Sequence, residues 1–579
     1  MVGMYVATVP NRRSPPAILL REGYREGRTV KTRTLANLSD WPAERIAALQ
    51  RVLRGESVGR CGPAFEIERT RPHGHVAAVL GTVRRLALDT VLGAKRSAER
   101  DRVVGMIVAR VLAPGSKLAT ARELRAETLT STLGELLGLD AVTEDELYEA
   151  MDWLRDRQEH IETQLATRHL REGTLALYDV TSTYFEGRTC PLARFGHSRD
   201  GKAHKLQIVF GLLTDPEGRP VAVEVFEGNT ADPQTVGTVV EKLRQRFGLR
   251  QVVLVGDRGM LTTARLREDL KTAPGIEWIT ALRAPQIQQL VQAGTLQLGL
   301  FDERDLAEIT APAYPDERLV ACRNTLLAAQ RRHTRAELLH ATERELAKIA
   351  AATQRATRPL RGKTAIALRV GRVLGRFKMK KHFQLTIDDT TFVYQRDRQR
   401  IEREAALDGI YVIRTSVPSA TLPSAEVVRH YKRLATVERA FRSVKTVDLK
   451  VRPIHHRLAE RVRAHVLLCV LAYYVEWHMR RDLAPLLFDD EDKPAAEALR
   501  ASVVAPAKRS PKAERKAHTK RTDDGAPVHS FQTLLEDLAT VAKNRVRPKL
   551  ETAATFDVIT TPTALQQRAF DLLCVSPRM

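Results

Sequence analysis

Two aspartates follow apolar segments of the chain in the same way. Asp179 follows the run LALY at 175–178, and Asp257 follows the run QVVLVG at 251–256. Each run has the composition of a buried β-strand, and functional groups collect at the carboxyl ends of strands in an open sheet. Two carboxylates held there repel each other unless a cation lies between them, and Mg²⁺ prefers such oxygen ligands. The pair indicates a metal site, whereas for either aspartate alone a turn or helix cap is the alternative.

A third carboxylate, Glu438, lies in a segment that is predicted to be helical over 424–447. Tyr431, Glu438 and Lys445 are spaced by seven residues, close to two helical turns, so they are expected on one face. Arg442 follows Glu438 by four residues and joins that face. Such a face can bring a third carboxylate to a metal pair and hold a phosphate beside it. A surface helix with an ordinary Glu–Arg pair is the alternative.

The elements that position these residues belong to a multidomain α/β protein. A chain of 579 residues is too long for one core. Periodicity and composition divide it into a basic β-hairpin module at 1–60, with its turn at Glu26-Gly27, a helical DNA-binding domain at 70–170, the first part of a mixed-sheet core at 174–284, a β-rich insertion at 285–405, the last part of the core with its following helix at 406–480, a flexible basic linker at 504–528 and a C-terminal helical region at 529–579.

The charge balance favours a polyanionic partner. The chain has 93 Lys and Arg against 70 Asp and Glu, which gives a net charge of +23 and a pI of about 10.0. Cationic side chains displace counterions from phosphates, so double-stranded DNA is the expected partner. A solvated basic surface without a partner is the alternative.

The cysteines and the apolar segments indicate where the protein is found. The five cysteines lie far apart and form no CxxC pattern, as expected in a reducing compartment. The N-terminus has no long apolar core behind its charges, so no signal peptide is expected. The longest apolar run, 466–475, is about half the roughly 20 residues of a membrane span. We therefore expect a cytoplasmic protein, associated with the nucleoid, without a membrane partner.

Six segments together resemble a known family. They are YDVTSTYFEG, VAVEVFEGNTADPQT, VGDRGM, LDGIYVIRT, YKRLATVERAFRSVK and RPIHHRLAERVRAHVLLCVLAYYV. In this order they resemble a DDE transposase of a bacterial insertion sequence, in the family with a Tyr…Glu…Lys signature and an insertion before the last acid. The resemblance covers about residues 20 to 480. The family's arginine three residues after the tyrosine is Leu434 here, and Arg433 is one position away, so no phosphate contact is expected from Arg433.

The resemblance implies a ribonuclease H-like core and a catalytic triad. The metal-binding residues would be Asp179, Asp257 and Glu438, holding two Mg²⁺ ions that Mn²⁺ can replace. Hydrolysis at the end of the element would free a 3′-hydroxyl, which would then attack target DNA. A homodimer is expected, because two DNA ends must be held. The side chains that we expect to contact DNA phosphates are Tyr431, Arg442, Lys445 and Arg258.

Two other functions remain open from the sequence. The first is a metal-dependent nuclease with the same core that never joins strands. The second is a DNA-binding regulator whose chemistry has lapsed, and the presence of all three acids counts against it.

Overall fold

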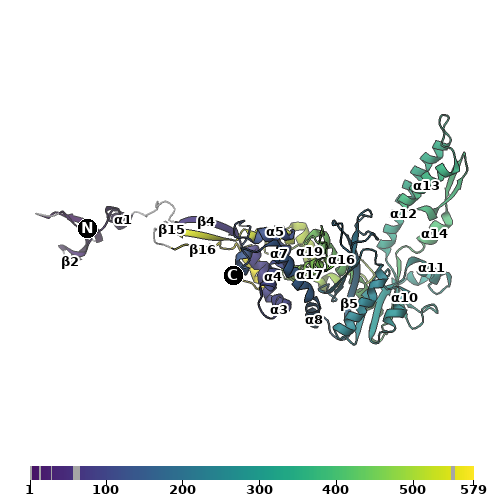
Figure 1. Ribbon diagram of the computed structural model, residues 1–579, viewed down its shortest axis with the longest axis horizontal. Helices are drawn as coiled ribbons and strands as arrows, with labels where there is room; N and C mark the ends of the chain where they lie inside the picture. The colour runs from purple at the N-terminus through teal and green to yellow at the C-terminus, as the bar shows by residue number, and fades with distance from the viewer. Residues whose placement is uncertain (1–2, 12–14, 28, 56–64, 129, 549–553) are drawn as a thin grey trace. The chain divides into compact units, whose positions relative to one another are not determined.

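The computed structural model describes residues 3–11, 15–27, 29–55, 65–128, 130–548 and 554–579. It consists of two compact units (Figure 1). The first unit contains Met1–Thr70 and Asn544–Val558, and the second contains Arg71–Lys543 and Ile559–Met579. The candidate carboxylates all belong to the second unit.

The first unit contains a small antiparallel sheet and most of a second three-stranded sheet. One sheet has the order β1 (Gly3–Val9), β2 (Ala17–Glu26) and β3 (Thr29–Asn37), and helix α1 (Ala43–Leu53) packs against β1. The other sheet joins β16 (Phe556–Ile559), β15 (Ala542–Pro548) and β4 (Phe65–Pro72). The predicted hairpin is confirmed, because β2 pairs with β3 as far as Glu26 opposite Thr29. Residues 56–60 of the predicted module lie outside the described residues.

The second unit begins with helices. They are α2 (Gly74–Arg85), α3 (Leu88–Leu92), α4 (Ala98–Leu112), α5 (Lys117–Leu124), α6 (Leu133–Leu137), α7 (Glu144–Asp156) and α8 (Gln158–His169). Local sequence explains several starts, since Ser97 and Ser116 cap α4 and α5, and Thr143 forms a capping box with Glu146 in α7. These helices belong to the same compact unit as the central sheet.

The central sheet has eight strands in the order β10-β11-β14-β9-β8-β5-β6-β7. The strands are β5 (Thr174–Tyr184), β6 (Gln207–Thr214), β7 (Pro220–Glu227), β8 (Val252–Gly256), β9 (Ile276–Ala281), β10 (Leu306–Ile309), β11 (Arg318–Arg323) and β14 (Ile410–Thr415). Strand β8 is parallel to both β5 and β9, and the other pairings are antiparallel. The sheet is therefore mixed, as the sequence predicts.

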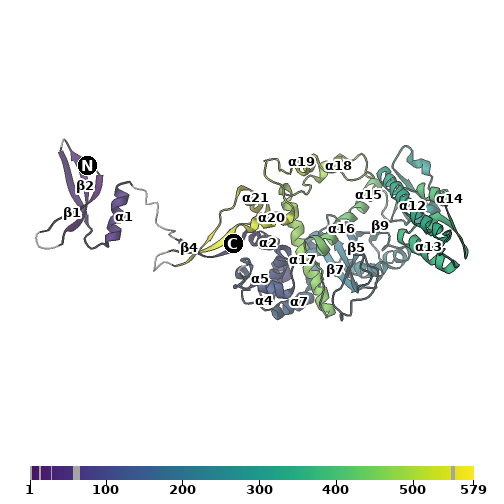
Figure 2. The same cartoon turned by 90° about the horizontal axis from the view of Figure 1, so that it is seen from above.

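Short helices connect the strands, and a long one packs between the sheet and the first helices. The connections are η1 (Asp232–Thr235), α9 (Val236–Glu241), η2 (Lys242–Arg246), α10 (Thr263–Arg265) and η3 (Leu266–Leu270). After β14 come α15 (Ser424–Lys432), α16 (Leu434–Arg442), η6 (Ser443–Val447) and α17 (Ala459–Asp482). Helix α17 is mostly buried and packs against α4, α7 and β7 (Figure 2).

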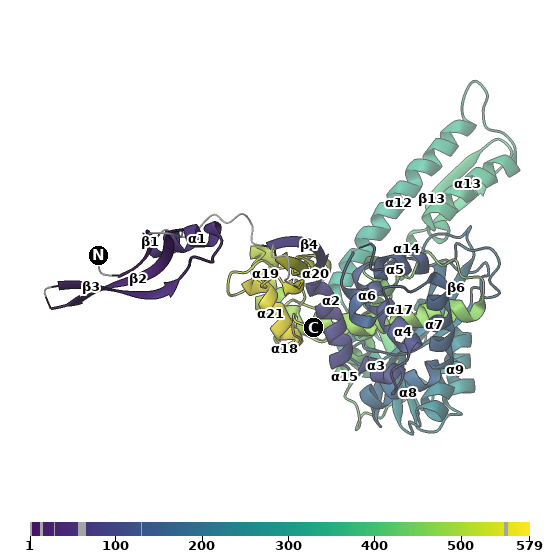
Figure 3. The same cartoon turned by 60° about the vertical axis from the view of Figure 1, so that its left-hand side comes forward.

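The prediction of a β-rich insertion at 285–405 is wrong. After α11 (Ala284–Gln292) and η4 (Leu298–Phe301), strands β10 and β11 join the central sheet. The remainder is a helical arm, in which α12 (Thr325–Thr353) lies along α13 (Lys363–Phe377) (Figure 3). A hairpin of β12 (Phe383–Ile387) and β13 (Phe392–Arg396) and helix α14 (Arg398–Ala405) complete it, after η5 (Lys380–His382). The segment 363–377 is helical because Ile366, Val370 and Leu374, four residues apart, are buried in an apolar cluster with α12.

The prediction of a flexible linker at 504–528 is also wrong. This segment contains α19 (Pro511–Thr519), which Ser510 caps. Lys516 is 1% exposed, and its Nζ donates to the carbonyl oxygens of Ala484 and Asp489. Around it lie η7 (Ala484–Leu486) and α18 (Lys493–Ala498).

The C-terminal region contains α20 (Phe531–Ala539) and α21 (Ala564–Leu573), with strands β15 and β16 between them. The sequence analysis predicts a purely helical region here, and the two strands show that this prediction is wrong in part. Among the described residues, no single helix has the length and apolarity to cross a membrane, and only the sharply bent pair α4 and α5 meets those criteria when taken together.

Candidate active site

The two aspartates lie at the same level on neighbouring parallel strands. The register of β5 and β8 places Tyr178 opposite Gly256, and Asp179 and Asp257 are the next residues of the two strands. Adjacent strands lie about 4.8 Å apart. The sequence analysis places Asp179 at the end of its strand. In the structure β5 continues beyond Asp179 to Tyr184, paired with β6. Asp179 is instead the first residue of β5 beyond its pairing with β8.

Asp179 is electrostatically strained by its surroundings. Burial raises the pKa of its carboxyl from 3.8 to about 7. A hydrogen bond of 2.8 Å from the backbone N–H of Val180 and the nearby guanidinium of Arg199 oppose this rise in pKa. Asp257 and Glu438 raise the pKa further, so both carboxylates lie close enough to repel Asp179. The structure therefore brings the three predicted acids into electrostatic contact.

Helix α16 brings Glu438 to the strand. It packs against β5 and buries Val437, Ala440 and Phe441, and the ring of Phe441 meets that of Phe210 edge-on, with 5.5 Å between the centroids. Glu438 lies on the exposed side of this helix. Apolar packing thus fixes the helix that carries the third acid, although the whole arm separates Glu438 from Asp257 in the sequence.

The helix around Glu438 is not continuous. It is interrupted at Arg433, which is exposed between α15 and α16, and after Arg442 it continues as the π-helical turn η6. A π-turn changes the phase of a helix, so the seven-residue spacing does not place Lys445 on the exposed face with Glu438. Lys445 is instead 9% exposed.

Lys445 is bound by the strand that carries Asp179. Its Nζ donates to the carbonyl oxygen of Ser182 at 2.6 Å and to the hydroxyl of Thr181 at 3.2 Å. It also forms an ion pair of 2.7 Å with Asp200, which pairs with Arg452 at 2.8 Å. Burial lowers the pKa of Lys445, and Asp200 opposes this change. Lys445 therefore joins the end of the helix to β5.

Of the other residues expected at DNA phosphates, Tyr431 and Arg258 lie beside Asp257. The hydroxyl of Tyr431 donates to Asp257 Oδ1 at 3.5 Å, and burial raises the pKa of Tyr431. Arg258 lies near enough to Tyr431 to oppose that rise, and its side chain is exposed. Arg442 is exposed at the end of α16.

The sequence analysis missed a segment that lies along β5. The guanidinium of Arg199 donates to the carbonyl oxygen of Val180 and to Asp232, and the backbone N–H of Arg199 donates to Ser182 Oγ at 3.1 Å. Ser182 Oγ in turn donates to the carbonyl oxygen of His197 at 3.0 Å. Residues 197–200 thus fasten the strand next to Asp179. They lie in an irregular segment, and no periodicity marks them.

The sequence comparisons identify the family. The model of the transposase DDE domain matches residues 182–475, which is more than half of the chain, and the model of the IS1634 family transposase N-terminal domain matches residues 6–61. The chain belongs to the DDE transposases of insertion sequences. The first match includes Asp257 and Glu438 and begins three residues after Asp179.

Other comparisons with this transposase are more distant. No curated protein matches its sequence. Among solved structures, it is similar to the piggyBac transposase in a synaptic complex with hairpin DNA, with a TM-score of 0.32, 10% sequence identity, and coverage of 70% of this chain and 72% of that one.

The donor set of the site suits a hard divalent cation in its chemistry. Three carboxylates offer oxygen ligands, and the raised pKa of Asp179 shows that nearby cationic groups do not offset the burial and repulsion of its charge. Within the described part of the chain, no three His, Cys, Asp or Glu side chains lie close enough together to form a finished metal site. The three acids lie in the same region, but their carboxylate groups do not meet at one point.

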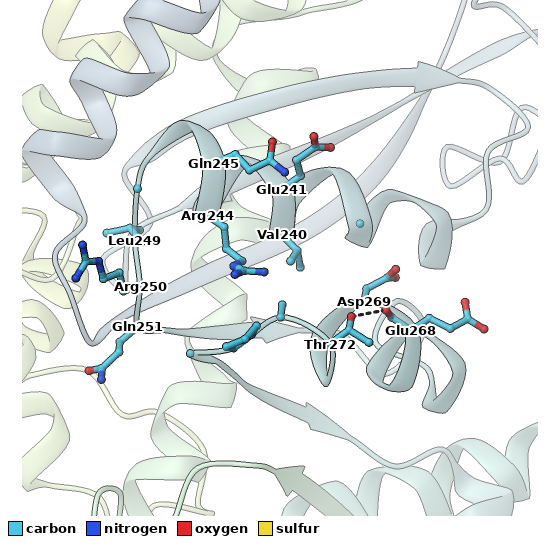
Figure 4. A pocket seen from close by; sticks show the side chains of 15 residues that line it. Val240, Glu241, Arg244, Gln245, Leu249, Arg250, Gln251, Glu268, Asp269 and Thr272 are labelled. Carbon is cyan, nitrogen blue, oxygen red and sulfur yellow. Dashed lines mark hydrogen bonds between the residues drawn. The ribbon is translucent and has the colours of Figure 1, made fainter.

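A cavity lies elsewhere in the second unit. It measures about 850 Å³, and Figure 4 shows it between the helical segments that contain Arg244 and Glu268. Its lining includes Gln251 and Gly275, the residues immediately before β8 and β9. Asp257 follows the carboxyl end of β8, so the cavity and the acids lie at opposite ends of this strand. It is not part of the candidate active site.

Proposed function

We propose that this transposase binds the ends of its insertion sequence, hydrolyses DNA there and joins the freed 3′-hydroxyl to target DNA. The observation that supports the proposal is the register of β5 and β8, which puts Asp179 and Asp257 side by side, together with the packing of α16, which carries Glu438, against β5. A half-buried carboxyl beside two further acids is costly for folding, and it is understandable as a site that a cation completes.

We also propose that the core of the sheet is ribonuclease H-like. Strands β7, β6 and β5 form an antiparallel meander, and β5 is followed in the sheet by the parallel strands β8 and β9. This arrangement supports the proposal because it places the first two acids on adjacent central strands. Strands β14, β11 and β10 extend the same sheet beyond β9.

In this proposal Asp179, Asp257 and Glu438 would hold two Mg²⁺ ions, with Mn²⁺ as a substitute. When bound, such cations supply Lewis-acid stabilisation of the attacking and leaving oxygens of phosphoryl transfer. The hydroxyl of Tyr431 holds Asp257 in place. Ser182 is occupied by Arg199 and His197, so it supports the strand and is not a nucleophile.

Phosphate binding near the acids is assigned to exposed cations. Arg258 and Arg442 are exposed and can donate to a DNA phosphate without breaking a buried contact. Lys445 would first have to leave Asp200 and the carbonyl of Ser182, so we assign it to positioning β5 instead. Two DNA ends require two sites, and we propose a homodimer as the active form.

The test is a cleavage and joining assay with the full-length protein. Linear DNA that carries an element end and a supercoiled target would be incubated with Mg²⁺, and the Asp179→Asn, Asp257→Asn and Glu438→Gln variants would be compared with the exposed control changes Asp302→Asn and Glu303→Gln. We expect cut ends and joined product from the wild type and both controls, and neither from the three variants. Cleavage without joined product would indicate a nuclease instead, and binding without cleavage a regulator.

A further inference from the structure

The arm formed by α12, α13 and the β12–β13 hairpin has a core of its own. This apolar cluster contains Leu339, Leu346, Ile349, Ile366, Val370, Leu374, Met379, Phe383 and Phe392. At the base of the arm, Arg335 of α12 pairs with Asp408, which precedes β14, and both side chains are buried. The exposed side of α13 therefore contributes little to the folding of the arm, and another role has to explain its composition.

The outer side of the arm is unusually basic. Residues 355–387 contain ten Lys and Arg and no Asp or Glu, and all ten basic residues are exposed: Arg355, Arg358, Arg361, Lys363, Arg369, Arg372, Arg376, Lys378, Lys380 and Lys381. Lys381 is paired with Glu404 at 2.5 Å, and Arg376 lies near Glu345 of α12. Repulsion among so many like charges is unfavourable in a free protein, which indicates that an anionic partner offsets it.

Three of these arginines form one row. Arg369, Arg372 and Arg376 lie at i, i+3 and i+7 on α13, on the side opposite Ile366, Val370 and Leu374. The row is about 10 Å long, from the rise of 1.5 Å per residue. Three phosphates of a DNA strand fit along such a row, because each strand of a duplex has one charge per about 3.4 Å of axis.

Two exposed glycines lie on α13 beside this row, next to the exposed side chain of Leu368. Gly371 and Gly375 are exposed, and a Cβ added at either would have no atom within 4 Å. A glycine inside a helix costs about 1 kcal/mol relative to alanine, and no contact within the described residues explains these two. Beside the row of arginines, these two glycines leave part of the α13 backbone open to a large partner.

We propose that this face of α13, defined by Arg369, Arg372 and Arg376, binds the phosphate backbone of double-stranded DNA without regard to sequence. The inference rests on the proposed function, since a transposase must hold both element and target DNA. Contacts to phosphates position a duplex but do not read its bases.

The test compares two triple variants of equal charge. R369Q/R372Q/R376Q removes the row, and R244Q/R250Q/R267Q removes three exposed arginines near the cavity at the other edge of the sheet. Binding of the full-length proteins to a fluorescent duplex of arbitrary sequence, about 30 base pairs long, would be measured by anisotropy in EDTA, between about 50 and 200 mM salt. Thermal unfolding would show that both variants are folded.

We expect the row variant to bind DNA roughly ten- to a hundred-fold more weakly at about 0.1 M salt. The slope of the logarithm of the binding constant against the logarithm of the salt concentration should be shallower by about 2 to 3, since each phosphate contact contributes about 0.9 to it. An element-end duplex should lose affinity by the same factor, and the control variant should lose less than about three-fold. Equal losses in both variants, an unchanged slope, or a row that captures anionic lipid vesicles but not DNA would overturn the proposal. Because the binding assay is done in EDTA and needs no metal, its outcome is separable from that of the cleavage test.

Discussion

Replacing Asp179 with asparagine should stabilise the metal-free protein at neutral and alkaline pH. Burial and two neighbouring acids raise the pKa of this carboxyl from 3.8 to about 7, which corresponds to roughly 4 kcal/mol of folding free energy. Because the pKa is higher in the folded state, the stability associated with the protonated carboxyl is complete below about pH 4 and is lost as the pH rises to about 7. Asparagine has nearly the same shape but does not ionise, so it avoids that loss.

The assay is urea unfolding in EDTA at pH 5 and pH 8, followed by tryptophan fluorescence. Trp278 on β9 is 1% exposed in the same sheet as Asp179, so unfolding of the sheet exposes it to solvent. Ionisation of Asp179 should lower the free energy of unfolding of the wild type by roughly 3 kcal/mol from pH 5 to pH 8. Asp179→Asn should lack that loss and be more stable than the wild type by up to about 4 kcal/mol at pH 8.

A matched variant and a cation separate this effect from others. Asp302→Asn removes an exposed carboxylate and should follow the wild type at both pH values. Adding Mg²⁺ should stabilise the wild type but not Asp179→Asn, because a ligand stabilises only the state that binds it. The reasoning is refuted if Asp179→Asn is less stable than the wild type at pH 8, or if its gain is the same at pH 5 and pH 8.

Three further predictions concern the residues around the site and the arm. Asp200→Asn should lower the free energy of unfolding by about 3 kcal/mol in thermal or urea denaturation, because it leaves Lys445 and its partner arginine largely buried without a counter-charge; an unchanged stability would contradict this reading. Arg335→Met should speed amide hydrogen exchange at the base of the arm, since Asp408 is then buried without its cation, whereas unaltered exchange there would count against an anchoring role. Leu346→Ala should cost about 2–5 kcal/mol and loosen the arm, and limited proteolysis that spares the arm in this variant would be inconsistent with a separate core.

The sequence predicts the strands of the site better than it predicts their ends. The apolar runs before Asp179 and Asp257 are both β-strands, and they are neighbours in the sheet. Strand β5 continues through Thr181, Ser182 and Thr183 to Tyr184, where no apolar alternation marks its end. Pairing with β6 extends the strand, and this is a long-range contact.

The helical arm and the position of Lys445 show where local patterns fail. The segment of α13 has Val and Gly, which favour other conformations, but packing against α12 makes it a helix. The seven-residue spacing of Glu438 and Lys445 assumes an uninterrupted α-helix, and the turn η6 removes that assumption. Asp200, which binds Lys445, lies in an irregular segment, so only the folded structure reveals it.

The most direct test of the central claim is the position of a bound metal. Crystals of the transposase grown with Mn²⁺ and element-end DNA would be measured at the manganese absorption edge, and anomalous peaks would locate the ions. The account predicts manganese bound by Asp179 and Asp257, with Glu438 as a ligand of the same site. Manganese at other residues, with these three carboxylates empty and the DNA nevertheless cut, would contradict it.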